Sequence, residues 1–188
     1  MHKQIDINGK KIVYSVHGNG KPVMLVHGFG ETGEVWKNQI AYLEDDFQLI
    51  IPDLPGSGES DIIDDMSMEG MAEIIRIIFD KEKNLKLSEG SQVSPPVGGG
   101  DLELAGGALI GHSMGGYITL AFASRYPDYL SAIGLFHSSA FADSEDKKET
   151  RKKGIEFIRA HGAFEFLKNS TPNLFAPLSK DEKPKLID

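Results

Sequence analysis

The residue best suited to covalent chemistry is Ser113, at the centre of the segment 111–116, Gly-His-Ser-Met-Gly-Gly. A short apolar run at 108–110 precedes this segment, and an apolar helical pattern at 117–123 follows it. A Gly-x-Ser-x-Gly pattern between a strand and a helix holds the serine in a tight turn at the carboxyl edge of a sheet. The helix N-terminus there favours developing negative charge. We therefore predict that Ser113 is a nucleophile, and the alternative is a Gly-Ser turn without chemistry.

A second turn, with the sequence His-Gly-Phe-Gly at 27–30, follows the apolar run at 22–26. If both turns end neighbouring strands, the backbone amides of Phe29 and Met114 point into one crevice. Two such donors stabilise the oxyanion of a tetrahedral intermediate, and each is typically worth about 2.7–4 kcal/mol of barrier. We therefore expect Phe29 and Met114 to form an oxyanion hole beside Ser113.

The histidines near these turns, or after them, do not supply an evident base. We expect the His27 ring to brace its own loop by hydrogen bonding, and the His112 ring to point away from Ser113. His137 ends the strand next to the nucleophile turn and could lie near the site, whereas His161 falls in a later helical region. We expect both of these later histidines to be structural or on the surface.

The elements that must position these residues alternate between strands and helices. Apolar runs and period-2 patterns predict strands at 3–7, 10–16, 22–26, 47–51, 108–110 and 132–136. An Asn-Gly pair at 8–9 favours a hairpin between the first two strands. Helical spacing marks 35–43 and 68–79, the second capped by Ser67. Such alternation predicts an α/β fold with a mostly parallel sheet, helices on both faces, and ligands at the carboxyl ends of the strands.

Two later segments depart from this alternation. Residues 88–107 hold Pro-Pro, Gly-Gly-Gly and Gly-Gly with little apolar periodicity, which predicts a long flexible loop. The loop follows a helix and precedes a strand, so we place it at the amino edge, opposite Ser113, and expect no phosphate site there. A charge-dense run at 143–153 is then followed by helical spacing without strands. We predict a core at 1–140 and helices lying over the sheet at 141–188.

Three motifs together resemble the serine α/β-hydrolases, of the capped esterase and lipase-like kind. They are His-Gly-Phe-Gly at 27–30, Asp-Leu-Pro-Gly-Ser-Gly at 53–58 and Gly-His-Ser-Met-Gly-Gly-Tyr at 111–117. They stand in the family's order and on the expected elements. The resemblance runs from the first strands to the last residue, except for 88–107, which the usual family pattern lacks.

The resemblance implies a role for each matching residue. Ser113 would be the nucleophile, and Phe29 and Met114 would give the oxyanion hole. Asp53 would be structural, fixing the turn after its strand, and 141–188 would be part of a helical cap. The implied substrate is a small-molecule carboxylic ester, hydrolysed through an acyl-enzyme without metal or cofactor.

The sequence departs from the family where the acid and the base should stand. The family places an Asp or Glu and then a His on loops after later strands, and no such pair can be assigned after Phe136. A capping-box pattern at 179–182 opens a helix within about two turns of Asp188. We therefore expect a fold incomplete at its C-terminal end, from a fragment, a truncated gene product or one half of a split enzyme. The strand at 132–136 would be an uncovered edge, able to pair with a second chain or another copy.

The composition of the chain limits the classes of partner that it can bind. The chain has 188 residues with 40% hydrophobic and 26% charged, as in a soluble globular protein, and its net charge of -8 argues against nucleic acid and anionic membranes. It has no cysteine, which excludes disulfides and thiolate metal sites. No stretch resembles a signal peptide or reaches transmembrane length, so we expect a cytoplasmic protein without a membrane span.

These observations leave more than one function open. The leading hypothesis is a serine hydrolase of carboxylic esters, probed by labelling of its active-site serine. Perhydrolases, C–C bond hydrolases and lyases share a serine at this turn, whereas dehalogenases and epoxide hydrolases call for an Asp there. The missing acid and base favour a different class, a non-catalytic binding or interaction protein that keeps the pocket.

Overall fold

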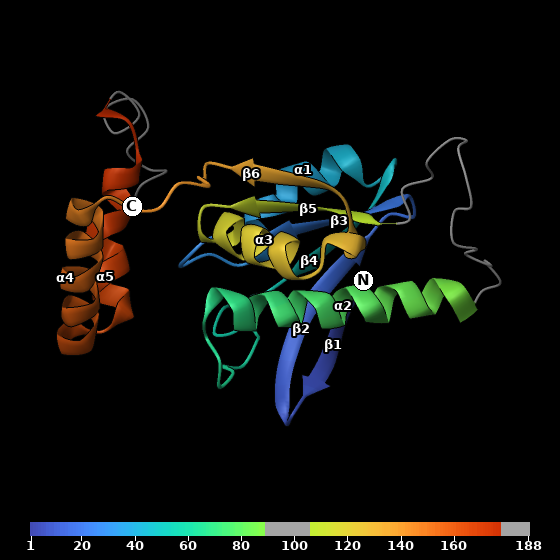
Figure 1. Cartoon of the computed structure of the whole chain (residues 1–188), viewed down its shortest axis with the longest axis horizontal. Helices are drawn as coiled ribbons and strands as arrows, with labels where there is room; N and C mark the ends of the chain where they lie inside the picture. Colours follow the sequence, from blue (N-terminus) through green and yellow to red (C-terminus); the bar gives the residue numbers. More distant parts are fainter. Residues whose placement is uncertain (89–105, 178–188) are drawn as a thin grey trace. The chain divides into compact units, whose positions relative to one another are not determined.

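The fold is described from a computed structural model that covers residues 1–88 and 106–177. The chain divides into two compact units, Met1–Ala140 and Phe141–Asp188 (Figure 1). Within the described residues, the first unit holds all the strands and the second holds helices alone. The predicted flexible loop at 88–107 falls, for all but its ends, outside the described residues, as does the predicted capping box at 179–182.

Six strands form one mixed sheet, in the order β1-β2-β4-β3-β5-β6. They are β1 (His2–Ile7), β2 (Lys10–His17), β3 (Lys21–Val26), β4 (Phe47–Pro52), β5 (Gly107–His112) and β6 (Leu130–Phe136). The pairs β4–β3, β3–β5 and β5–β6 are parallel, whereas β1–β2 and β2–β4 are antiparallel. The predicted mostly parallel sheet is confirmed, with each strand near its expected bounds.

The first two strands form the predicted hairpin. Asn8 and Gly9 have φ of 55° and 78°, the left-handed values that a two-residue hairpin turn of type I′ needs at both central positions. Gly9 supplies this conformation without steric cost, and its amide donates a hydrogen bond of 2.9 Å to the Asp6 carboxylate.

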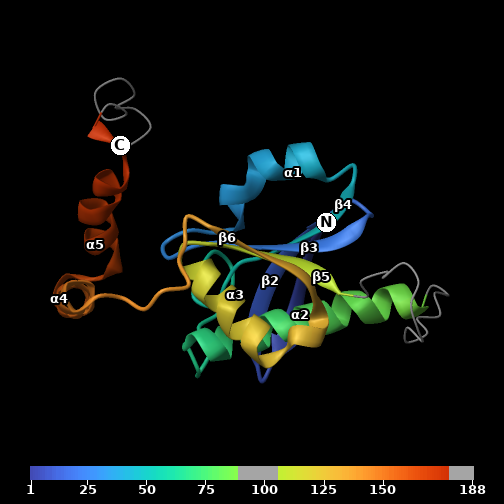
Figure 2. The same cartoon turned by 45° about the horizontal axis from the view of Figure 1, so that its top comes forward.

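Helices cover both faces of the sheet (Figure 2). On one face lie a short 3₁₀ turn, η1 (Gly33–Trp36), and α1 (Lys37–Leu43); on the other lie α2 (Met68–Ser88) and α3 (Met114–Arg125). As predicted, the Ser67 hydroxyl caps α2, accepting a hydrogen bond of 3.0 Å from the Gly70 amide. No helix in the described parts of the chain is long and apolar enough to cross a membrane.

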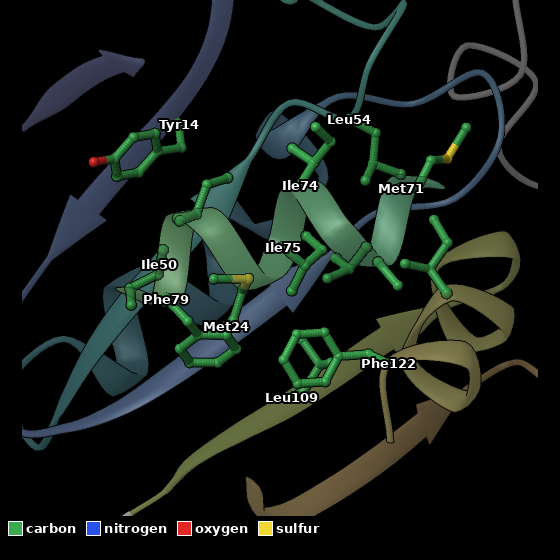
Figure 3. Close-up of a cluster of buried hydrophobic side chains, with 14 of the residues drawn as sticks. Tyr14, Met24, Ile50, Leu54, Met71, Ile74, Ile75, Phe79, Leu109 and Phe122 are labelled. Atoms are coloured by element: carbon green, nitrogen blue, oxygen red, sulfur yellow. The ribbon is translucent and has the colours of Figure 1, made fainter. Parts of the chain in front are cut away.

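The larger hydrophobic core lies between the sheet and the pair α2–α3 (Figure 3). Met24, Ile50 and Leu109 enter it from the sheet, and Ile75 and Phe122 enter it from the two helices. A smaller cluster on the opposite face joins Trp36 to apolar side chains of β3 and β4. Burial on both faces explains why the central strands read as continuous apolar runs.

A buried ion pair ties β1 and β2 to the middle of α2. The Glu82 side chain is only 4% exposed, and its carboxylate accepts hydrogen bonds from Lys3 Nζ at 2.8 Å and from the Tyr14 hydroxyl at 2.7 Å. Burial, followed by the hydrogen bond to Glu82, raises the pKa of Tyr14. The carboxylate is fully partnered, as a buried charge must be.

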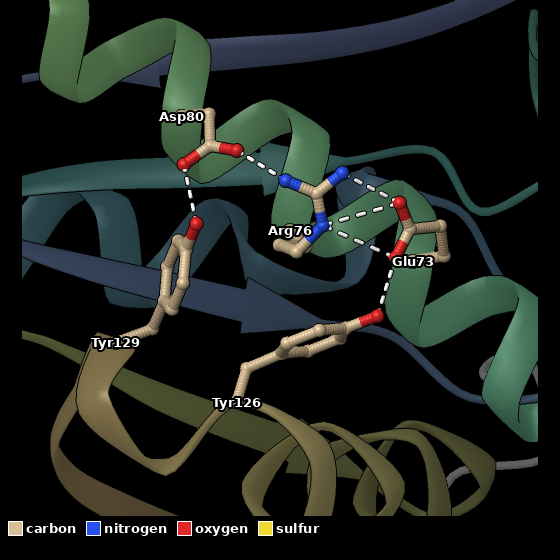
Figure 4. Close-up of polar contacts among 5 residues, drawn as sticks. All are labelled: Glu73, Arg76, Asp80, Tyr126 and Tyr129. Carbon is tan, nitrogen blue, oxygen red and sulfur yellow. Dashed lines mark hydrogen bonds and ion pairs between the residues drawn. The ribbon is translucent and has the colours of Figure 1, made fainter.

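A polar cluster joins α2 to the end of α3 on the surface (Figure 4). Arg76 bonds the carboxylates of Glu73 and Asp80, one turn away in either direction, and the hydroxyls of Tyr126 and Tyr129 donate to the same two carboxylates. The hydrogen bond from Arg76 lowers the pKa of Glu73. Because these side chains are partly exposed, the cluster orients the two helices more than it stabilises the fold.

The second unit is a pair of helices within its described part. These are α4 (Glu145–His161) and α5 (Ala163–Ser170), followed by the 3₁₀ turn η3 (Thr171–Leu174). Gly162, with φ of 88°, makes the turn between them, and the rings of Phe157 and Phe166 lie 6.4 Å apart. The charge-dense run forms the exposed first half of α4. That this unit is part of a helical cap stays a prediction.

Candidate functional site

Ser113 stands at the junction of β5 and α3, in a strained backbone conformation. Its φ is 51° and its ψ is -113°, a combination that residues with a Cβ rarely adopt. The glycines around it are required by close packing. A Cβ on Gly111 would lie 2.1 Å from the Gly115 carbonyl oxygen, and one on Gly115 would lie 2.4 Å from that of Val26. The predicted strand–turn–helix elbow is confirmed.

Backbone contacts hold this conformation. The Ser113 amide donates to the carbonyl of Phe136, at the end of β6, over 3.0 Å. The Ser113 carbonyl in turn accepts from the Ser138 hydroxyl at 2.8 Å and from the Gly116 amide at 3.0 Å. The strain at Ser113 is therefore balanced by bonds to the chain that leaves the edge strand.

The turn after β3 lies directly against Ser113. Val26 pairs with Gly111, so the two turns leave the sheet side by side. A Cβ on Gly28 would lie 3.1 Å from the Ser113 Cβ, which is tighter than an ordinary van der Waals contact. Phe29 follows with an exposed side chain, and Met114 is half-buried. That the amides of these two residues form an oxyanion hole stays a prediction.

His27 has the structural role expected of it. The ring is fully buried, and its Nε2 accepts a hydrogen bond of 2.9 Å from the Leu54 amide. Nδ1 must then carry the proton, which it donates to the Gly28 carbonyl over 2.8 Å. Burial is the main reason that the pKa of His27 is lowered. A ring with both nitrogens engaged in bracing two loops does not act as a base.

Asp53 is structural in the same way. One carboxylate oxygen accepts from the Gly33 amide at 2.8 Å, and the other from the Glu59 amide at 3.3 Å. A Cβ on Gly58 would lie 2.1 Å from this carboxylate, so the turn after β4 closes tightly around it.

Glu31 and His112 form a pair beside the nucleophile turn. The Glu31 carboxylate oxygen Oε2 lies 2.8 Å from His112 Nδ1 and accepts the Gly28 amide over 2.7 Å. The His112 ring therefore lies against Glu31 of the loop after β3. That it points away from Ser113 stays a prediction. Sequence reasoning missed Glu31, although it directly follows the His-Gly-Phe-Gly turn.

The two histidines that follow Ser113 in the sequence lie in different places. His137, with φ of 46°, is exposed at the end of β6, and its ring lies 6.1 Å from that of His112. His161 is in α4, against Phe157. Within the described residues, no hydrogen bond joins the Ser113 hydroxyl to any histidine.

Pockets also lie away from the two turns. One, of about 480 Å³, lies between the β1–β2 hairpin and α2, and another, of about 310 Å³, lies between β2 and η1. Ser113 lines neither of these two pockets. In the part of the chain described, no group of three potential metal-ligating side chains comes together.

Comparison with known proteins shows which family the chain belongs to. A model of the alpha/beta hydrolase family matches residues 23–184, which is most of the chain. The chain belongs to the alpha/beta hydrolase family. The predicted fold class is thereby confirmed.

Relatives of this α/β-hydrolase include enzymes of more than one activity. Lipase 1 of Psychrobacter immobilis is 34% identical over 136 residues, or 71% of this chain and 37% of the lipase. A cis-3-alkyl-4-alkyloxetan-2-one decarboxylase of Shewanella oneidensis is 28% identical over 138 residues, again 71% of this chain and 37% of that protein.

The fold also matches solved structures. An esterase from Thermogutta terrifontis has a TM-score of 0.75 and 30% identity, and the match covers 100% of this chain and 64% of that one. This α/β-hydrolase chain thus spans well under half the length of the two curated relatives and about two thirds of the solved esterase.

Proposed function

We propose that this chain carries the nucleophile of a serine hydrolase acting on carboxylic esters, and that Ser113 is this nucleophile. The observation that carries the proposal is the strained Ser113 backbone, next to a Gly28 at which an added Cβ would lie 3.1 Å from the Ser113 Cβ. Strain of this kind persists only where the surroundings enforce it, and it gathers at functional sites. Likeness to a lipase and to an esterase supports the choice of ester substrates.

In the proposed reaction, Ser113 Oγ attacks the ester carbonyl and its proton passes to a base. The carbonyl oxygen becomes an oxyanion, which the amides of Phe29 and Met114 stabilise. Collapse of the intermediate expels the alcohol, which takes up the proton, and leaves an acyl group on Ser113. Water then attacks the acyl-enzyme by the same route, releasing the acid and restoring the serine.

A second candidate is a non-catalytic binding protein with this fold. The observation in its favour is that no histidine bonds the Ser113 hydroxyl within the described residues. A serine without a base is a weak nucleophile. The two candidates differ in one measurable property, which is the reactivity of Ser113.

A fluorophosphonate probe tests the choice directly. The full chain is incubated with the probe, and the labelled residue is identified by peptide mass spectrometry. Serine-hydrolase chemistry predicts a label on Ser113 that is lost in Ser113→Ala and kept in Ser131→Ala, a control on β6. A folded wild-type chain that acquires no label at Ser113 would favour the binding protein.

A further inference from the structure

We propose that Glu31 is a positioning residue that locks the oxyanion turn onto the nucleophile turn. This inference rests on the proposed function, because it assigns Glu31 a part in the reactivity of Ser113. It goes beyond that function by naming a carboxylate that neither holds substrate nor exchanges protons with it. Glu31 acts through two neighbours, Gly28 and His112.

A single oxygen of Glu31 serves both turns. Oε2 accepts the Gly28 amide at 2.7 Å and the His112 Nδ1–H at 2.8 Å. Gly28 immediately precedes Phe29 in the oxyanion turn, and His112 immediately precedes Ser113. The carboxylate therefore binds each turn at the residue just before the one proposed to act in the reaction, which is Phe29 in one turn and Ser113 in the other. Hydrogen bonds to an ionised acceptor are roughly twice as strong as neutral ones.

The bond to Glu31 also fixes which amide of the turn is engaged. The Gly28 amide donates to the carboxylate, so its hydrogen bond holds the turn and does not face a substrate. If the carboxylate is removed, the peptide unit between His27 and Gly28 loses this hydrogen bond, while the next unit keeps the bond of 2.8 Å from His27 Nδ1 to the Gly28 carbonyl. That next unit carries the Phe29 amide, whose direction then depends on the His27 bond without the support of Glu31.

His112 is held as firmly from its other side. Its ring packs edge-on to Trp36, with centroids 6.4 Å apart at 87°, and lies 5.7 Å from the ring of Phe136. Trp36 is only 5% exposed and belongs to the core, whereas Phe136 is 47% exposed. Glu31 is thus bound to a ring that packs against the core residue Trp36. Through its bond to the Gly28 amide, it restrains the loop after β3.

Partial burial makes this bridge effective. The side chains of Glu31 and His112 are 28% and 22% exposed, less than those of ordinary surface pairs such as Lys148–Glu145, at 52% and 88%. Shielding from water strengthens the contacts. An aligned oxyanion donor is worth about 10²–10³-fold in rate, so a misaligned one should cost about 10- to 100-fold.

The test measures how fast the full chain is labelled at Ser113 by a fluorophosphonate, as a function of probe concentration. The variants are Glu31→Ala, which deletes the bridge, and Glu31→Gln, which keeps its shape without the charge. Glu34→Gln removes the same charge from an exposed position three residues away and is the matched control. Rates are normalised to the folded fraction, taken from thermal unfolding.

Positioning predicts a specific pattern. The maximal labelling rate should fall about 10- to 100-fold in Glu31→Ala and less in Glu31→Gln, because Gln restores an acceptor oxygen. The probe concentration at half-maximal rate should change little, and Glu34→Gln should match the wild type. If the Ala variant does not fold, the Gln variant alone decides the matter through its maximal rate.

A double-mutant cycle tests whether Glu31 acts through His112. If Glu31 acts through His112, Glu31→Gln combined with His112→Asn should be no slower than the slower single variant. Wild-type labelling together with Glu31 variants of unchanged maximal rate would overturn this inference and leave the proposed function standing. A wild-type chain that does not label Ser113 would overturn the proposed function, and the inference with it.

Discussion

The backbone amide of Ser113 donates a hydrogen bond of 3.0 Å to the carbonyl of Phe136, across the β5–β6 boundary. Phe136 is the last residue of the edge strand β6 in the described sheet. The candidate nucleophile is therefore held by the outermost strand as well as by its own turn. Two residues further on, Ser138 bonds the Ser113 carbonyl from the same strand end.

The strain at Ser113 predicts that glycine at this position stabilises the folded chain. Its φ of 51° is in a region that costs a residue with a Cβ about 1–3 kcal/mol. Ser113→Gly should therefore raise the free energy of unfolding in urea by about 1 kcal/mol relative to Ser113→Ala. Ser15→Gly, in the regularly paired part of β2, should instead lower the free energy of unfolding by about 0.5–1 kcal/mol relative to Ser15→Ala. Equal stability of the Gly and Ala variants at 113 would show that the turn is not strained.

The buried His27 predicts a loss of stability in mild acid. Burial lowers the pKa of His27 below its ordinary 6.5, so the unfolded chain takes up this proton at a higher pH than the folded chain. The stability that the neutral ring confers is full above about pH 6.5 and declines as the pH falls toward the folded pKa. Urea titrations over this range should show a shallower decline in His27→Gln.

The matched control for that experiment is His161→Gln, at an exposed position of α4. It should keep the wild-type decline. Burial also lowers the pKa of His17, which contributes in the same direction and persists in both variants. A His27→Gln profile parallel to that of the wild type would contradict the assigned cause.

The exposed edge strand predicts self-association. Ile133 and Leu135 of β6 are 46% and 36% exposed, on a strand whose outer edge has no partner within the described sheet. Edges of this kind pair with other chains. Sedimentation should show oligomers that dissociate in Ile133→Lys. Ile62→Lys, in an exposed loop position, should leave them intact. A wild-type chain that stays monomeric at all concentrations would contradict the prediction.

Ester turnover should be slow. Because no histidine bonds the Ser113 hydroxyl within the described residues, we expect the chain to hydrolyse p-nitrophenyl acetate far below the rate of an ordinary esterase. Loss of triad members elsewhere leaves about 10³–10⁴-fold over water, from the oxyanion hole and binding. Turnover at the usual esterase level, abolished in Ser113→Ala, would point to an unrecognised base, and His137 would be mutated first.

Local patterns made most of the fold predictable from the sequence. The central strands are continuous apolar runs because both faces are covered, and Asn8-Gly9 specifies the hairpin by backbone conformation alone. The tight turn at Ser113 was predictable because added Cβ atoms on the glycines around it would meet other atoms at less than 3 Å. The second unit kept its helical spacing at α4 and α5 as well.

The contacts that were missed join residues far apart in the chain. Glu31 and His112 are 81 positions apart, and only the parallel pairing of β3 with β5 brings them together. The Tyr126 and Tyr129 contacts with α2 depend in the same way on how two helices pack. Local periodicity assigns such residues to elements, but it does not carry the register between those elements.

The strand order has a consequence for how the protein is made. β3 pairs with β4, which follows it closely, and with β5, which begins only at Gly107. On the ribosome the N-terminal part emerges first, so one side of β3 stays unpaired until β5 is synthesised. The centre of the sheet and the Ser113 turn, which directly follows β5, are therefore completed in the same step. Until then the nascent chain presents an open edge of β3 to other strands.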